Sequence, residues 1–166
     1  MEMNDRELLY IIKELLDEGG ADTELVVTDG QEALELEDRA GEEPRLACNI
    51  TVCHPSEDTT AVQFLISMFF GLDEKTTENI SRVLPEMNYL LSIGSFGCLP
   101  EDGYVYLSHA FLTDGLEMKN ILLSFCACFD TLSVTALRGR ELLAPLINGE
   151  LLPEEAEPEQ LRIVQF

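Results

Sequence analysis

The sequence has 166 residues, of which 46% are hydrophobic and 25% are charged, a balance typical of a folded globular chain. Its 32 acidic and 10 basic residues give a formal net charge of −22. A field of this sign repels a phosphate backbone, so we expect neither nucleic acid nor an anionic membrane as a partner. A basic or apolar protein segment suits such a surface better, and acidity that merely keeps the protein soluble is an equally good explanation.

The N-terminus and the cysteines both indicate the cytoplasm. The opening residues, MEMNDRELL, lack the basic and apolar regions of a signal peptide. The longest uncharged runs, 59–72 and 87–100, are shorter than the roughly 18 residues that suggest a membrane span. The 5 cysteines are odd in number and scattered, which is not a disulfide framework, and in a reducing compartment they are most simply small core residues. We therefore expect a cytoplasmic protein.

The first helix is predicted from a capping pattern. Asn4 followed by Glu7 is typical of an N-cap with a carboxylate at the third helical position. Apolar side chains then recur at helical spacing, at Leu8, Ile11, Ile12, Leu15 and Leu16. Gly19 and Gly20 end the pattern, and we expect Gly19 in the left-handed position that closes a helix.

A two-stranded hairpin is predicted next. Residues 24–28 and 32–37 have the composition of strands, and they flank Asp29 and Gly30, a pair favoured in tight hairpin turns. In the second of these runs, Leu34 and Leu36 alternate with acidic residues. This strand should therefore bury one face and expose the other.

Two further strands are expected after the polar turn at 40–44. Residues 45–53 predict a strand, and residues 54–59, HPSEDT, predict a loop. Residues 61–70, AVQFLISMFF, are apolar on both faces and fit either a central strand or a short buried helix. We favour the strand, because β-branched and aromatic residues dominate and Gly71 follows.

The same apolar run is the best candidate for an interaction surface, if part of it is exposed. Its partner-facing side would consist of Phe64, Ile66, Met68 and Phe70. We add Leu123 from a later helix, because Leu123 and Cys128 lie off the main apolar stripe of that helix. Residues off the stripe indicate a second contact, such as a subunit interface.

A helix and a second hairpin are predicted in the middle of the chain. Asp73 caps a helix whose apolar residues recur as far as Leu91, and Pro85 should either kink it or divide it into two abutting helices. Residues 93–99 and 104–112 then form strands around Pro100-Glu101-Asp102-Gly103, which contains the Pro and Gly of a reversing chain.

The chain is expected to end in helices and an extended tail. Residues 116–132 carry one broad apolar stripe, and a further helical stretch runs from about 133 to 148, with Pro145 as a break. Residues 150–160 are an acidic linker by composition, and the final LRIVQF is apolar and prone to form a strand, which could dock as an added edge strand. We therefore predict one domain at 1–149 and a linker with an apolar tail at 150–166.

No residue pattern proposes a reaction, a metal site or a cofactor. Cys126 and Cys128 point to different sides of a helix, so these two thiols cannot share one ion, and His54 adds one imidazole only. His109 shares a strand face with Leu107 and Phe111, so a partly buried histidine is a better interpretation than a general base. We therefore assign no catalytic, cofactor-binding or metal-binding residue.

The element order is similar to that of the type III secretion chaperone-like fold, and within it to the YbjN-like branch of bacterial proteins. The resemblance covers residues 5–148 in arrangement and rests on 84–91 with Asn88, 93–96, 101–103, 104–112 and Gly115. It implies a non-enzymatic and often dimeric module that presents its sheet and apolar patches to a protein partner.

The predicted fold class is α+β, with an antiparallel sheet packed against helices in the order helix, strands, helix, hairpin, helix. Our first hypothesis is a protein-binding module, chaperone-like or a regulatory adaptor, that binds a protein partner or client segment and forms a homodimer. A small-ligand-binding sensor domain is the alternative. An enzyme ranks third, because its sequence support is limited to His109 with Cys98 or Ser108 nearby.

Overall fold

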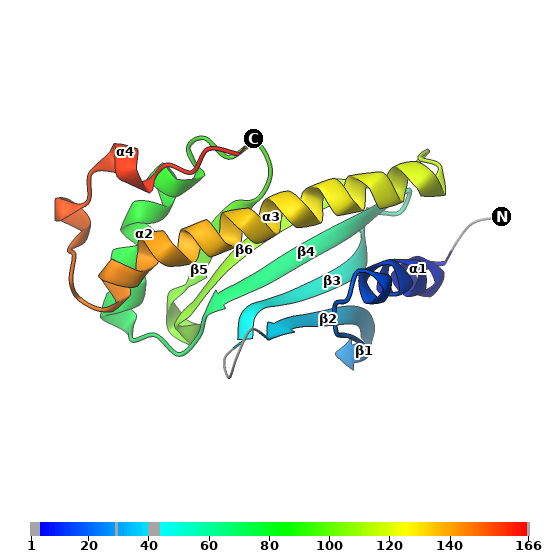
Figure 1. Ribbon diagram of the computed structural model, residues 1–166, viewed down its shortest axis with the longest axis horizontal. Helices are drawn as coiled ribbons and strands as arrows, with labels where there is room; N and C mark the ends of the chain where they lie inside the picture. Colours follow the sequence, from blue (N-terminus) through cyan, green and yellow to red (C-terminus); the bar gives the residue numbers. More distant parts are fainter. Residues whose placement is uncertain (1–3, 29, 40–43, 166) are drawn as a thin grey trace. The chain divides into compact units, whose positions relative to one another are not determined.

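The computed structural model describes residues 4–28, 30–39 and 44–165 (Figure 1). Within these ranges the helices are α1 (Asp5–Glu18), α2 (Glu74–Asn88), α3 (Met118–Ile147) and α4 (Pro158–Leu161). Short 3-10 turns lie at η1 (Pro100–Asp102) and η2 (Pro153–Glu155). The strands are β1 (Thr23–Thr28), β2 (Gln31–Arg39), β3 (Pro44–Ser56), β4 (Thr59–Phe69), β5 (Ser95–Leu99) and β6 (Tyr104–Leu112).

These strands form an antiparallel sheet in the order β1-β2-β3-β4-β6-β5, which confirms the α+β class. The chain also divides into two compact units. The first unit comprises residues 1–65 and 109–129, and the second comprises 66–108 and 130–166. Elements β4, β6 and α3 each contribute residues to both units.

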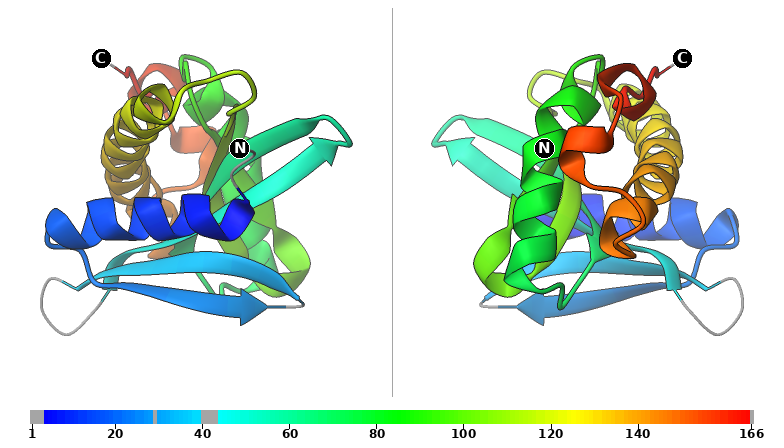
Figure 2. Two further views of the ribbon diagram at one scale, coloured as in Figure 1. Left: turned by 90° about the vertical axis from the view of Figure 1, so that its right-hand side faces the viewer. Right: turned by 90° about the vertical axis from the view of Figure 1, so that its left-hand side faces the viewer.

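In the first unit, α1 lies along β1, β2 and β3 (Figure 2). The predicted capping box is confirmed, because Glu7 N donates to Asn4 Oδ1 at 2.8 Å and Asn4 N donates to Glu7 Oε2 at 3.2 Å. The prediction for Gly19 is wrong by one residue. Gly19 remains helical at φ −73°, and Gly20 takes the left-handed position at φ 87° while Ala21 N donates to Leu16 O.

The β1–β2 hairpin is confirmed in the described residues. Thr28 pairs with Gln31, so two residues form the turn, although Asp29 lies outside the described residues, as do 40–43 of the predicted turn at 40–44. Leu34 and Leu36 are buried while the acidic residues beside them in β2 are exposed or half-buried. The alternation therefore gives β2 one solvent-exposed face, as the pattern predicted.

The predicted loop at 54–59 is wrong. Strand β3 continues to Ser56 and β4 begins at Thr59, so only Glu57 and Asp58 form the turn. The pairing of β3 with β2 ends at Thr51, so beyond it β4 is the neighbour of β3. A strand edge without a neighbour tolerates Pro55, which has no N–H to donate. Residues 61–69 are in a strand, as we favoured.

In the second unit, α2 is a single helix that includes Pro85, so the alternative of two abutting helices is wrong. Asp73 caps it as predicted, because its Oδ1 accepts from Thr76 N at 3.0 Å. At the other end, the Asn88 amide accepts from Phe96 N at 2.8 Å and donates to Phe96 O at 3.0 Å. This side chain pairs with β5 much as a neighbouring strand would.

The second hairpin is confirmed, although its first strand begins at Ser95 and not at Ile93. Gly103 follows η1 with φ 59°, and a Cβ there would collide with the backbone of Leu72. Its carbonyl accepts from Leu72 N at 3.1 Å. Glycine is therefore required at this turn, because it alone accepts both the left-handed conformation and the close approach.

Helix α3 and the tail differ from the predictions. The predicted break at Pro145 is absent, since α3 runs unbroken from Met118 to Ile147. The predicted solvated linker at 150–160 is also wrong, because η2 and α4 contact α2 (Figure 2). The residues that follow form no strand within the described part of the tail, so the predicted edge strand is wrong. Leu161 and Ile163 are buried instead, which anchors the tail in the second unit.

Candidate functional site

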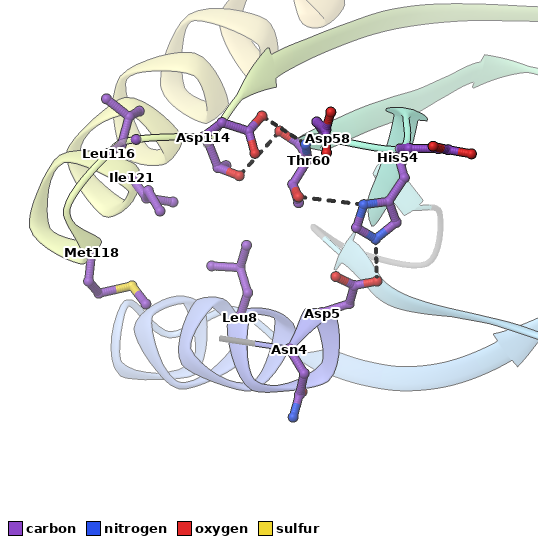
Figure 3. A pocket seen from close by; sticks show the side chains of 13 residues that line it. Asn4, Asp5, Leu8, His54, Asp58, Thr60, Asp114, Leu116, Met118 and Ile121 are labelled. Atoms are coloured by element: carbon purple, nitrogen blue, oxygen red, sulfur yellow. Dashed lines mark hydrogen bonds and ion pairs between the residues drawn. The ribbon is translucent and has the colours of Figure 1, made fainter. Parts of the chain in front are cut away.

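A polar pocket lies in the first unit, and we call it the His54 pocket (Figure 3). Its volume is about 720 Å³. The start of α1, the β3–β4 turn and the segment between β6 and α3 supply its walls. The polar side contains His54, Glu57, Asp58 and Asp114, and the apolar side contains Leu8, Met118 and Ile121.

Hydrogen bonds and an ion pair join the three segments of the His54 pocket. His54 Nε2 lies 2.9 Å from Asp5 Oδ2, and His54 Nδ1 lies 3.5 Å from Thr60 Oγ1. Asp114 Oδ2 accepts from Thr60 N at 2.8 Å, and Thr113 N donates to Thr60 O at 2.9 Å. These bonds hold the β3–β4 hairpin to the first turn of α1 and to the end of β6.

The order Asp5, His54, Thr60 is that of a carboxylate, an imidazole and a hydroxyl, but the geometry does not favour nucleophilic catalysis. The imidazole to hydroxyl distance of 3.5 Å is at the limit of a hydrogen bond. The hydrogen bond to Asp5 raises the pKa of His54, which favours the charged imidazolium over the neutral base. The arrangement is better suited to joining α1 to the β3–β4 hairpin or to binding a positively charged group.

A second hollow lies in the second unit, between α3 and the tail, and we call it the C-terminal groove. Its volume is about 670 Å³. Asp130, Val134 and Arg138 line it from α3, and residues 162–165 line it from the tail. The sequence did not predict this groove, because its last six residues indicate an added edge strand and no local pattern places α3 beside them. The alternation in LRIVQF was the available signal, since Leu161 and Ile163 are buried while Val164 is exposed.

Gln165 holds the tail in place. Its Oε1 accepts from Ser92 N at 2.8 Å and from Ile93 N at 2.9 Å. Its Nε2 donates to Ile93 O at 2.7 Å and to Thr135 Oγ1 at 3.1 Å. One amide therefore satisfies the backbone of Ile93 and ties the tail to α3.

Arg162 anchors the other end of the extended segment. Its Nε donates to Glu86 Oε2 at 3.1 Å. Its guanidinium also lies over the ring of Tyr89, 4.7 Å from the ring centroid. A stacked and paired arginine loses little additional freedom when it meets a further partner. The groove wall formed by residues 162–165 is thus fixed at both ends by α2 and by the segment that follows it.

Three of the five predicted partner-binding residues are core residues. The exposed fraction is 0% for Phe64, 1% for Ile66 and 4% for Met68. Phe64 stacks on Phe125 of α3, with ring centroids 5.3 Å apart. The prediction is wrong for these three, because side chains covered within the fold cannot meet a partner.

The other two predicted residues are exposed. Leu123 is 59% exposed on α3. Phe70 is 67% exposed, although one side of its ring stacks on Tyr104 with centroids 4.7 Å apart. The two residues belong to different units, Leu123 to the first and Phe70 to the second. Both remain candidates for contacts with a partner.

The histidine and cysteine side chains away from the two hollows do not form a metal site among the described residues. In the part of the chain that the structure describes, no group of three or more His, Cys, Asp or Glu side chains is arranged to hold a metal ion. His109 is half-buried, and burial lowers its pKa. Cys48 is buried, which raises the pKa of its thiol to about 12.

Helix α3 is unusually apolar for its exposure. By length and composition it is the one helix among the described residues that is long enough and apolar enough to cross a membrane. Only 28% of its most apolar stretch is buried. Core helices of soluble proteins pass the same test. Helix α3 therefore leaves apolar surface uncovered, at Leu123, Val134 and Leu137.

The comparisons with known proteins add no assignment. No protein-family model matches the sequence, and a search of curated proteins finds no match.

Proposed function

We propose that the protein is a non-enzymatic, cytoplasmic protein-binding module, chaperone-like or a regulatory adaptor, that acts as a homodimer. The exposed apolar surface of α3 carries this proposal. Leu123, Val134 and Leu137 are all exposed on this helix, in addition to the residues that it buries in the core. A helix that is apolar on its outer side as well as its inner side is suited to being covered on both. The proposed relationship to the YbjN-like family agrees with such a role.

The surface around Leu123 is the proposed dimer contact. Residues 120–129 carry no charged side chain. Two copies of a chain with a net charge of −22 repel each other over most of their surface, and an uncharged patch is where they approach at least electrostatic cost. A two-fold contact brings the same patch from each copy together, so Leu123 would pack against its own counterpart or its neighbours.

Light scattering after size-exclusion chromatography tests the dimer. We expect twice the 18.6 kDa mass of one chain at micromolar concentration. Leu123→Asp should give the mass of one chain, because it places a charge in the centre of the contact. Val27→Asp is the matched control, since Val27 is also exposed in the first unit, and it should leave the dimer intact. A wild-type mass of one chain across the micromolar range would rule out the dimer.

Affinity purification from the source organism tests the partner. We expect one protein in stoichiometric amount with the wild type, and much less of it with Val134→Asp, at both low and moderate salt. Salt sensitivity of the recovered complex would show whether the acidic field contributes to the contact. Recovery of the tagged protein alone would contradict a binding module.

A small-ligand-binding sensor is the second candidate, and the His54 pocket favours it. Asp58, Glu57 and Asp114 line the pocket, so a small amine is the ligand class that fits its charge. We expect a panel of mono- and diamines to raise the melting temperature of the wild type. Asp58→Asn should remove most of that shift, and Glu78→Gln, which changes an acidic residue of the second unit, should not. Equal shifts in both variants would indicate nonspecific binding of cations.

A further inference from the structure

We propose that the C-terminal groove binds an extended segment of a partner protein that carries apolar residues and a carboxylate. The inference rests on the proposed function and identifies the site and the kind of segment. Three observations support it: the conformation of the tail, the state of its backbone groups, and the side chains of the groove.

The tail wall of the groove has the form of a strand without a neighbour. Arg162 has φ −74° and ψ 128°, and residues 162–165 are neither helical nor paired in the sheet. Ile163 points inward and is 5% exposed, whereas Val164 is 54% exposed. Successive residues that face opposite sides are characteristic of a strand. Its anchors, Arg162 and Gln165, hold it in that conformation before any partner arrives.

The two middle residues of this segment have backbone groups without a hydrogen-bond partner among the described residues. Among the described residues, no hydrogen bond reaches the N–H or C=O of Ile163 or Val164. Backbone groups of a residue as buried as Ile163 are normally paired, and an extended peptide that aligns with such a segment supplies the missing donors and acceptors. Main-chain pairing gives affinity in this mode, and pockets for alternate side chains give specificity.

The side chains of the groove define what the peptide should contain. Val134 on α3 is 68% exposed and faces the groove together with Val164, so an apolar side chain of the peptide would be covered there. A volume of about 670 Å³ lies in the range of ordinary ligand sites. Side chains that alternate along an extended peptide reach the groove at every second residue.

Charge selects a carboxylate beside the apolar residue. Two of the chain's 10 basic residues, Arg138 and Arg162, line the groove, against the single acidic residue Asp130. Arg138 uses only Nη1 to bond Glu141, and Arg162 uses only Nε to bond Glu86. Each guanidinium therefore keeps further N–H donors, which match a carboxylate in charge and geometry.

A peptide selection tests the inference. The full-length protein is immobilised and used to select binders from a displayed library of random ten-residue peptides. We expect enriched peptides to alternate apolar and other residues and to include Asp or Glu. Each should bind Val134→Asp and Arg138→Glu at least tenfold more weakly than the wild type. Val27→Asp is the matched control and should bind them as the wild type does. Thermal unfolding of each variant confirms that it is folded.

Amide hydrogen exchange locates the bound peptide on the chain. A general change in stability would not slow exchange at one particular segment. The enriched peptide should slow amide exchange at Ile163 or at Val164, whichever N–H faces the added strand, because successive N–H groups of an extended segment point to opposite edges and one of the two gains an acceptor. Enrichment of basic peptides, or no enrichment over the Val134→Asp variant, would overturn the inference. If peptides or a co-purified partner slow exchange elsewhere but at neither Ile163 nor Val164, the groove assignment fails while the binding function stands. If neither a peptide nor a partner binds, both fail.

Discussion

The His54 pocket and the C-terminal groove have similar volumes, yet they are held together by different physical means. The pocket depends on an exposed ion pair and on threonine and aspartate hydrogen bonds at the protein surface. The groove depends on a half-buried glutamine amide and on Leu161 and Ile163, which are buried. Exposed charges are screened by water and salt, whereas removal of a half-buried amide leaves the backbone groups that it bonded unsatisfied.

This difference determines which site can change without unfolding the protein. The residues of the His54 pocket should tolerate substitution, and their contacts should respond to pH and salt. The groove is part of the fold of the second unit, so its framework residues should be needed for stability. Its exposed residues, Val134 and Arg138, should be needed for binding alone.

The largest expected effect is the loss of the Gln165 amide. Gln165→Leu removes four hydrogen bonds and leaves the backbone of Ile93 unpaired, so we expect the free energy of unfolding to fall by about 2 kcal/mol. Urea denaturation measures the change. His54→Leu, which breaks an exposed pair, should have a clearly smaller effect. Equal losses in the two variants would mean that the groove and the pocket do not differ in this way.

A smaller effect is expected where α3 meets the sheet of the second unit. A Cβ at Gly139 would lie 2.6 Å from Phe96 Cε1 and 2.9 Å from Met68 Cε. Overpacking costs about 1–3 kcal/mol and exceeds the gain of about 0.5–1 kcal/mol in helix propensity, so Gly139→Ala should lower stability by about 1 kcal/mol. Gly139→Val should cost more. A raised melting temperature for Gly139→Ala would show that the helix and sheet are less tightly packed.

The smallest expected effect is a pH dependence with two opposing contributions. His54 has a raised pKa in the folded protein, so its contribution to stability is complete below the unfolded pKa and is lost as pH rises through the folded pKa. His109 has a lowered pKa, so the unfolded state takes up its proton first, and stability falls as pH decreases through the unfolded value of 6.5.

Single substitutions separate the two histidines. Between about pH 5.5 and 8, stability relative to the His54→Gln, His109→Gln double variant should fall with pH in His109→Gln and rise with pH in His54→Gln. Urea unfolding at several pH values measures both slopes. The chain has 2 histidines, so the double variant removes both contributions. A flat profile in His109→Gln would mean that the Asp5 contact does not hold His54 in solution.

Local patterns in the sequence were sufficient to predict most of the elements. The N-cap at Asn4, the turn around Gly103 and the alternation of Leu34 and Leu36 each depend on residues within a few positions of one another. Backbone conformation at such sites follows from nearby side chains, so a pattern of four to ten residues contains the necessary information. Errors of one or two residues, as at Gly19 and Ile93, concern the ends of elements, where neighbouring conformations differ little in energy.

Which apolar surfaces are covered depends on contacts between segments that are distant in the sequence. An apolar run such as 61–70 cannot show whether a helix lies over it, and Phe64 is buried because Phe125 packs on it from α3. His54 meets Asp5 across 49 residues, and Gln165 meets Ile93 across 72. Such contacts form only when the sheet and helices bring distant segments together, because no local pattern encodes the partner of a side chain. The sequence thus determined the elements, the acidity and the fold class, whereas the pocket, the groove and the exposed side of α3 depend on long-range packing.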